Sequence, residues 1–455
     1  MKKNDIYKGK VVDNGMEFEG IVKENNIPVF IPNAIKDEEI EYKVLKVNKS
    51  YAFGKVEKIL KESKYRIKPI CPAYHKCGGC SGMHIDYLKT LEMKKETVTN
   101  TLKKQGISKE LIEKIYGMKT PFYYRNKVQY PVRNINGKTV MGMFSKRTHS
   151  IVDIDKCYIA DKTIDEVANT LFNLLIEKSF VGLNEEDYTG DIRNIMVRRG
   201  IHTDEVMCVI VANRDIQQEL KKTDIIEKLT KKYSNIQSIV INVNTKKDNV
   251  ILSNENLCIY GKEYITDKIG EYTFKISVNS FFQVNTIQVE TLYTCLKDKL
   301  MLEKDNKVLE LYSGVGTIGI FLSKEVKEIL GVEIVEEAVK AAKENVDINK
   351  IENVKYICDD ATKAIEKLNE ENYKVDIVVV DPPRKGLDSK GIEILKNIKA
   401  KKIGYVSCNP ATLARDLNLL SDLYEVKSIN LVDMFPWTHH VECCSVLKLK
   451  ESTEI

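Results

Sequence analysis

Ile403-Gly404-Tyr405-Val406-Ser407-Cys408-Asn409-Pro410 is the stretch that decides how the C-terminal part of the chain folds. Its β-prone run, Ile403 to Val406, is followed by a cysteine and an Asn-Pro turn, which predicts a thiol at the carboxyl end of a strand. Ligands bind at this edge of open α/β sheets, so Cys408 is a candidate nucleophile. The alternative is a buried and inert cysteine, and the eleven cysteines of the chain keep that alternative open.

A second strand end lies about twenty residues earlier. The apolar run Ile377-Val378-Val379-Val380 leads directly into Asp381-Pro382-Pro383-Arg384. The two prolines stiffen the turn and leave the Asp381 carboxylate at the same predicted edge as the thiol.

The chain from residue 276 onward alternates predicted strands and helices, which indicates a parallel α/β sheet. A strand over 308–312, ending in Tyr312, runs into a turn that contains Gly314 and Gly316, where a cofactor can approach the backbone. Glu333 follows the next strand, in the position of a carboxylate that binds a ribose diol. No second mononucleotide-binding half follows, so the pattern favours S-adenosylmethionine over a dinucleotide, with a generic α/β domain as the alternative.

Length and composition set broad bounds. The 455 residues suffice for two or three domains, and the net charge of +5 gives only weak support for a nucleic-acid partner. The charged N-terminus carries no secretory signal and no apolar run reaches membrane-spanning length. We therefore expect a cytoplasmic protein with reduced, metal-bound or catalytic cysteines, no membrane association and no obligate protein partner.

Sequence patterns divide the chain into three domains. Residues 1–60 read as short strands separated by glycine turns, which predicts a small β-barrel. Residues 61–275 read as a mainly β (α+β) central domain with helical stretches at 161–178 and 215–233, after an amphipathic helix at 83–105. Residues 276–455 read as a Rossmann-like α/β domain.

Three cysteines stand within ten residues in a loop with a proline and paired glycines: Cys71, Cys77 and Cys80. Cys157 is the best candidate for a fourth ligand, ahead of His75 and His84. Four thiolates fit either zinc or a [4Fe–4S] cluster, although the spacing is not that of paired zinc knuckles. Unrelated free cysteines are the less favoured alternative.

Cationic side chains form two further candidate groups. Arg125 and Lys127 follow Phe122-Tyr123-Tyr124, and aromatic rings interleaved with cations suit stacking on bases and pairing with phosphates. A solvated strand end explains the same segment equally well. The cluster Arg193, Arg198 and Arg199 is interpreted as a solvated face.

A thiol beside a methyl donor needs a base as partner. A thiolate that adds to C6 of a pyrimidine makes C5 nucleophilic, and the methylated adduct must then lose its C5 proton before the thiol leaves. Glu442 directly precedes an apolar strand, where partial desolvation raises its pKa toward neutrality. His439 and His440 are rival bases, and the residues alone do not separate the three.

Four blocks of this sequence resemble the S-adenosylmethionine-dependent RNA uracil-5-methyltransferases. They are Ser280-Phe281-Phe282-Gln283-Val284-Asn285, Asp381 to Gly386, Val406 to Thr412, and Phe435 to Glu442. The resemblance implies that Cys408 is the nucleophile and Glu442 the base. It implies donor contacts from four side chains, Gln283, Tyr312, Glu333 and Asp381. Gly404 and Trp437 depart from the family pattern, but no key group is lost.

The front half of the chain looks like the branch of that family that acts on 23S ribosomal RNA. That branch combines a TRAM-like N-terminal barrel with a [4Fe–4S] cluster, here implied on Cys71, Cys77, Cys80 and Cys157. The helix within 83–118 is then expected to pack on the catalytic domain. The implied reaction is methyl transfer to C5 of specific uridines in 23S rRNA. The alternatives are a tRNA uracil-5-methyltransferase and a non-catalytic, cluster-containing RNA-binding factor of ribosome assembly.

Overall fold

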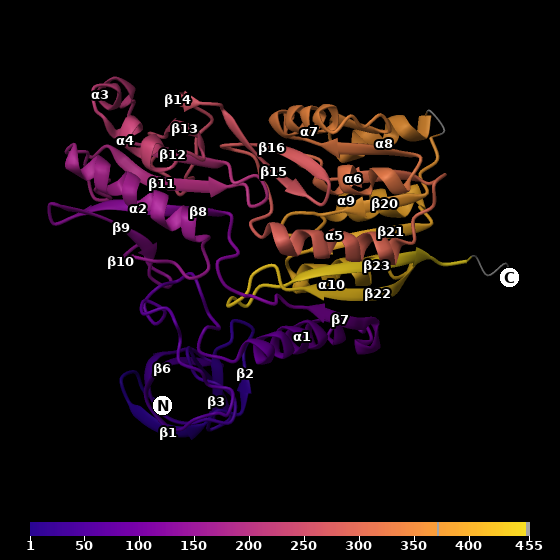
Figure 1. Cartoon of the computed structure of the whole chain (residues 1–455). Helices are drawn as coiled ribbons and strands as arrows, with labels where there is room; N and C mark the ends of the chain where they lie inside the picture. The colour runs from indigo at the N-terminus through magenta and orange to yellow at the C-terminus, as the bar shows by residue number, and fades with distance from the viewer. Residues whose placement is uncertain (371–372, 452–455) are drawn as a thin grey trace.

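The computed structural model describes residues 1–370 and 373–451. Figure 1 shows three bodies: a small N-terminal barrel, a central sheet with helices on one side, and a C-terminal sheet covered by helices on both faces. The mixed α/β class and the Rossmann-like C-terminal part that the sequence predicts are both confirmed. Within the described residues, no helix is long and apolar enough to cross a membrane.

The N-terminal sheet has six strands in the order β1-β5-β6-β4-β3-β2 and curls round on itself (Figure 1). Alternating residues of β5 face inward, because the side chains of a strand point to opposite faces in turn, and Ile40, Tyr42 and Val44 are fully buried there. The strands are β1 Ile6–Lys10, β2 Asp13–Asn14, β3 Gly20–Glu24, β4 Ile27–Ile31, β5 Glu39–Val47 and β6 Ala52–Lys61.

The segment after the cysteine loop belongs structurally to the C-terminal sheet. Helix α1, Tyr87–Lys103, packs against helix α10, Pro410–Leu420. The expected segment 83–118 is not helical throughout. After a short 3₁₀ turn, η1 Lys109–Leu111, the chain forms strand β7, Ile112–Tyr116, which pairs in parallel with β22, Tyr424–Val432.

The central sheet has seven strands in the order β10-β9-β8-β11-β12-β13-β14. Its middle strands are continuously buried because α2 and α4 cover one face and the two-stranded ribbon of β15 and β16, which leads on to the C-terminal part, packs on the other. The expected helical stretch at 215–233 is two helices. The elements are β8 Lys127–Ile135, β9 Lys138–Phe144, β10 Ile151–Asp153, α2 Lys162–Glu177, β11 Ile192–Arg199, β12 Val206–Ala212, α3 Gln217–Lys221, α4 Ile225–Lys232, β13 Ile236–Val243, β14 Asn256–Gly261, β15 Tyr264–Ile269 and β16 Tyr272–Ser277.

The interpretation of the arginine cluster as a solvated face is wrong for two of its members. Arg193 and Arg198 are 6% and 2% exposed. Arg198 donates to the carbonyls of Ser277 and Ser280, at 2.8 and 3.0 Å, and so holds the segment that leads to Gln283. Backbone carbonyls satisfy these buried guanidinium groups, and no local sequence pattern indicates them.

The C-terminal sheet has eight strands in the order β19-β18-β17-β20-β21-β23-β22-β7. The five strands from β17 to β21 are mutually parallel, and β23 runs antiparallel between β21 and β22. All four residues of β20 are buried because helices cover both faces, as expected for a central parallel strand. The elements are α5 Thr286–Leu300, β17 Lys307–Leu311, α6 Thr317–Leu322, η2 Ser323–Glu325, β18 Glu328–Glu333, α7 Glu336–Ile348, β19 Val354–Cys358, α8 Ala361–Glu370, β20 Ile377–Val380, α9 Ser389–Ile398, β21 Lys402–Ser407, α10 Pro410–Leu420, β22 Tyr424–Val432 and β23 Glu442–Leu449.

Candidate active site

Cys408 lies at the carboxyl end of β21 and directly before helix α10. Asn409 caps that helix, because its side chain accepts a hydrogen bond from the amide of Ala411 at 3.0 Å. The same side chain donates to the carbonyl of Arg384 at 3.0 Å, which ties the cysteine turn to the turn after β20. The half-buried thiol therefore has a fixed position near the positive end of a helix, where a thiolate is favoured.

Glu442 faces Cys408 across the sheet. Ser407 pairs with Cys443 in the antiparallel ladder of β21 and β23, so the next positions outward are Cys408 and Glu442. Cys408 itself lies just beyond the last paired residue of β21, and it is close enough to Glu442 for the charge of that carboxylate to raise the pKa of the thiol. The two groups that the sequence analysis pairs as nucleophile and base thus meet at one edge of the sheet.

Burial and neighbouring charge raise the pKa of both groups. Glu442 is 4% exposed, and desolvation followed by the charge of Asp381 raises its pKa to about 8. Burial also raises the pKa of Cys408, to about 11, with a further contribution from Glu442. Arg384 acts in the opposite direction on both, because its cation favours the ionised thiol and carboxyl.

The rival histidines are weak bases in this fold. Desolvation and then the neighbouring His439 lower the pKa of His440 to about 4, and desolvation lowers that of His439 as well. A base of pKa about 4 accepts a proton poorly at neutral pH, whereas the pKa of Glu442 is close to neutral pH. The electrostatics therefore favour Glu442, which the residues alone left equal to the two histidines.

The expected donor site lies at the carboxyl ends of β17 and β18, beside the point between β17 and β20 where the strand order reverses. Gly314 and Gly316 both have positive φ, of 54° and 82°, and the space beside Gly314 is open. Tyr312 has a φ of 61°, which is unusual for a bulky residue and marks strain at the strand end. Glu333 accepts from the amide of Gly314 at 3.0 Å, so its carboxylate also holds the glycine turn.

The two remaining expected donor residues come from different segments. Asp381 is half-buried, and desolvation raises its pKa to about 7. Gln283 is 7% exposed, and its backbone carbonyl accepts a hydrogen bond from the side-chain amide of Asn126 at 2.9 Å. That bond brings the expected RNA-contacting residues Arg125 and Lys127 alongside the donor segment. Burial, followed by the charge of Arg198, lowers the pKa of Lys127 to about 7.

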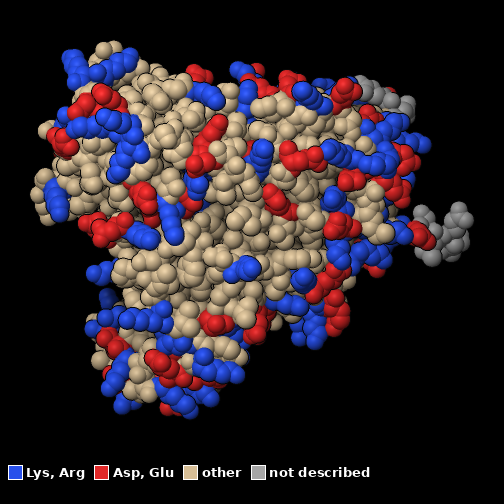
Figure 2. Space-filling view, viewed as in Figure 1, with Lys and Arg blue, Asp and Glu red and all other residues tan. Residues whose placement is uncertain are grey.

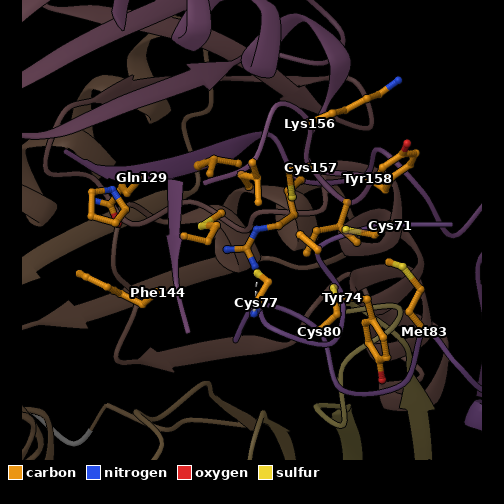
Figure 3. Close-up of a pocket in the computed structure, with 18 of the residues that line it drawn as sticks. Cys71, Tyr74, Cys77, Cys80, Met83, Gln129, Phe144, Lys156, Cys157 and Tyr158 are labelled. Carbon is orange, nitrogen blue, oxygen red and sulfur yellow. Dashed lines mark hydrogen bonds between the residues drawn. The ribbon is translucent and has the colours of Figure 1, made fainter. Parts of the chain in front are cut away.

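The four cysteines of the expected metal site line one cavity of about 290 Å³: Cys71, Cys77, Cys80 and Cys157 (Figure 3). Among residues 1–370 and 373–451, no group of three or more His, Cys, Asp or Glu side chains is placed to hold one metal ion. Burial raises the pKa of all four thiols, to about 11 for Cys157. Asp165 holds Cys157 in place by accepting from its amide at 2.7 Å.

A groove of about 920 Å³ leads from the barrel to Arg384, in the turn after β20. The barrel contributes Phe30 and Phe53, whose ring centroids lie 6.0 Å apart, and the catalytic part contributes Arg384 and His440. Four further cations or aromatic side chains line it: Arg125, Phe144, Lys146 and Arg147. On the face drawn in Figure 2, positive and negative side chains are interspersed, with an uncharged band above the barrel.

Sequence reasoning missed two residues that shape this site. Arg384 was visible in the Asp-Pro-Pro-Arg turn, but its influence on Cys408 and Glu442 appears only in three dimensions. Asp416, on α10, is fully buried and accepts from Tyr405 Oη at 2.6 Å and from the Leu387 amide at 2.8 Å. It fixes the turn after β20, and a lone aspartate in a helix carries no sequence signal for that task.

Comparison with known proteins identifies the family to which the chain belongs. An RNA methyltransferase of Oceanobacillus iheyensis, described as uncharacterized, is 40% identical over 99% of this chain and 98% of its own length. One from Clostridium acetobutylicum, described in the same way, is 41% identical over 98% of both chains. The crystal structure of Pyrococcus abyssi tRNA (uracil-54, C5)-methyltransferase with S-adenosyl-L-homocysteine superposes with a TM-score of 0.78 at 28% identity, covering 97% of this chain and all of that one. The profile of the tRNA (uracil-5-)-methyltransferase family matches residues 86–450, and the chain belongs to that family.

Proposed function

We propose that this protein transfers a methyl group from S-adenosylmethionine to C5 of uridine in 23S ribosomal RNA, with Cys408 as nucleophile and Glu442 as base. The observation that supports the proposal is the pairing of β21 with β23, which brings the strand ends that carry Cys408 and Glu442 together, within electrostatic reach of Asp381 and Arg384.

In this mechanism the Cys408 thiolate attacks C6 of the uracil ring. The S–C6 bond forms, the electrons of the C5=C6 double bond move onto the C4 carbonyl oxygen, and C5 becomes nucleophilic. Arg384 and the N-terminus of α10 favour the thiolate, although burial still keeps the pKa of Cys408 at about 11. S-adenosylmethionine, when bound, would supply the electrophilic methyl group: the methyl would pass from its sulfonium sulfur to C5, and S-adenosylhomocysteine would leave.

Glu442 completes the reaction by taking the C5 proton. The C5–H electron pair re-forms the C5=C6 double bond, the C6–S bond breaks, and the thiolate of Cys408 is released. A carboxylate with a pKa near 8 is a stronger base than an exposed one, and it stays partly ionised at neutral pH.

The donor is assigned to the carboxyl ends of β17 and β18. Gly314 and Gly316 let it approach the backbone, and Glu333 and Tyr312 stand beside them. Gln283 and Asp381 would border it on the side of Cys408. The substrate strand is assigned to the groove, where the rings of Phe30 and Phe53 can stack on bases. The cations that line the groove can pair with phosphates: Arg125, Lys146, Arg147 and Arg384.

A [4Fe–4S] cluster is proposed for the cysteine cavity. The four cysteines line one cavity, and four thiolates fit either zinc or a [4Fe–4S] cluster. The preference for the cluster over zinc rests on the resemblance to the rRNA-modifying branch. Cys71, Cys77, Cys80 and Cys157 would hold it, and each raised thiol pKa makes loading dependent on pH. Anaerobically purified protein should contain iron, and a preparation that contains only zinc would contradict this assignment.

The choice of 23S rRNA rests on the resemblance of the barrel and the cysteine set to the rRNA-modifying branch. One observation favours tRNA as a second candidate: the structure of an enzyme named for tRNA uridine 54 covers 97% of this chain, front half included.

The test uses 5-fluorouridine-substituted RNA and S-adenosylmethionine, with products resolved on a denaturing gel. Fluorine at C5 cannot be abstracted, so the reaction should stop at a covalent complex that is absent in Cys408→Ala. A complex with 23S rRNA fragments and not with tRNA is expected. A complex with tRNA alone would move the proposal to the second candidate, and none with either would overturn the reaction.

A further inference from the structure

The loop between β22 and β23 carries the proposed base at its far end. It covers residues 433–441, and its closing residue Glu442 is paired across the ladder with Val432. Asp433, the first residue of the loop, directly follows Val432, the residue that pairs with Glu442. Whatever fixes Asp433 also fixes the strand end from which the base projects.

A buried ion pair holds Asp433. The side chains of Lys94, on α1, and Asp433 are both 0% exposed, and Lys94 Nζ lies 2.6 Å from Asp433 Oδ1. The second carboxylate oxygen accepts from Tyr87 Oη at 2.8 Å. Lys94 also donates to the carbonyl of Phe435 at 3.1 Å, so one ammonium group fixes two points of the loop.

The backbone of this loop is anchored at five consecutive residues. Each carbonyl from 433 to 437 accepts from another part of the chain. The donors, in order, are Gln288, Asn285, Lys94, Tyr124 and the amides of Ser81 and Gly82. Trp437 adopts a φ of 65°, a strained value that only strong surrounding contacts maintain.

Lys94 is the only charged group among these anchors, and its helix also packs on the helix that follows the proposed nucleophile. Helix α1 packs on α10, which begins two residues after Cys408. An ion pair this deeply buried is costly to desolvate, and apolar residues of similar volume often give equal or greater stability. Its directional bonds instead select one position of the loop.

We propose that Lys94 is a positioning residue for proton abstraction, acting through Asp433 on the orientation of Glu442. The inference rests on the proposed function, since it takes Glu442 as the base. Loss of the pair should leave attack by Cys408 intact and slow the removal of the C5 proton. In the affected step the C5–H bond breaks, its proton goes to Glu442 and its electron pair re-forms the C5=C6 double bond. The C6–S bond breaks in the same step, and its electron pair leaves with the thiolate of Cys408.

The central variant is the double change Lys94→Met with Asp433→Asn. Lys94→Met alone leaves a buried, unpaired carboxylate and can prevent folding, whereas the double variant removes both charges and keeps an oxygen for Tyr87. Lys89→Met is the matched control, because Lys89 lies on the same helix but forms a more exposed pair with Glu92. Tyr87→Phe removes one bond to Asp433 without changing any charge.

Two rates are compared on denaturing gels: formation of the adduct with 5-fluorouridine RNA, and release of methylated product from natural RNA. For the double variant we expect formation within about twofold of the parent protein and release slower by at least about tenfold, so that an adduct with natural RNA accumulates. Tyr87→Phe should slow release by about threefold, and Lys89→Met should match the parent protein.

Release at the parental rate in the folded double variant would overturn the inference, and so would parental release in Tyr87→Phe if the double variant does not fold. A parallel loss of both rates would also overturn it, because it would indicate a general structural role. Absence of any adduct in the parent protein would instead contradict the proposed function, so the two failures are distinguishable.

Discussion

Replacing Glu442 by Gln should change the pH dependence of stability in a direction set by the burial of that carboxyl. Glu442 is 4% exposed, and its pKa is raised from 4.5 to about 8, first by desolvation and then by Asp381. Glutamine has nearly the same shape and does not titrate. The substitution therefore isolates the free energy that the fold loses when the carboxyl ionises.

The sign follows from proton binding. The folded state holds the Glu442 proton more tightly than the unfolded state, so the contribution of this group to stability is fully present below pH 4.5 and is lost as the pH rises to about 8. At about 1.4 kcal/mol per pH unit, the whole shift corresponds to about 5 kcal/mol. Between pH 5.5 and 8.5 the wild-type protein should lose about 3 kcal/mol that Glu442→Gln keeps.

The chain contains a built-in reporter for this measurement. Its single tryptophan, Trp437, is 3% exposed and lies in the same loop as Glu442, so its fluorescence follows unfolding of the catalytic edge. Urea unfolding at pH 5.5 and 8.5 gives the change in the free energy of unfolding between the two pH values for each protein. Subtracting the change for Glu442→Gln from that for the wild-type protein cancels the pH-independent cost of burying an amide. Glu425→Gln, at an exposed carboxyl on β22, is the control and should give a difference near zero.

Parallel stability curves for Glu442→Gln and the wild-type protein would refute the reasoning, because they would mean that Glu442 is not desolvated. The same variant should also accumulate a covalent complex with natural-uridine RNA, since the C5 proton cannot leave. Rapid release of normal product would remove Glu442 from the role of base.

Three further outcomes test other parts of the site. Adduct formation by Cys408 with 5-fluorouridine RNA should rise about tenfold per pH unit between pH 7 and 9, because the raised pKa of about 11 limits the thiolate; a flat profile in rapid-quench assays would contradict this. Gly386→Ala should lower the free energy of unfolding by about 2 kcal/mol or more, because its φ is 72° and the added Cβ would lie 2.6 Å from Asp416 Oδ2. Gly137→Ala is the control: open space surrounds this residue, so the substitution should lower the free energy of unfolding by only about 1 kcal/mol. Cys157→Ser should reduce the iron content measured by metal analysis, and unchanged iron would remove Cys157 from the ligand set.

The catalytic edge could be predicted from local sequence because each of its parts is local. An apolar run followed by a proline or glycine turn specifies a strand end, which is how Cys408, Asp381 and the turn at Gly314 were identified. Parallel strands align their carboxyl ends, so three separate strand ends converge without any knowledge of side-chain packing. The extended resemblance then assigned roles, and the family is confirmed.

The tertiary structure decided what depends on distant segments. Lys94 and Asp433 are 339 positions apart, and neither stands in a pattern that indicates a buried partner. Arg198 appeared to belong to a solvated face because charge is usually exposed, yet two carbonyls satisfy it in the interior. The segment at 112–116 joins the catalytic sheet only because β22 offers a free edge.

The assignment of the base needed both the sequence and the tertiary structure. The sequence by itself determined which groups stand near the sheet edge, since residue type and turn position are local properties. The sequence also predicted partial desolvation of Glu442, but only the fold determined that Asp381 lies beside it and that His440 becomes a weaker base, because neighbouring charge and burial depend on what surrounds each group.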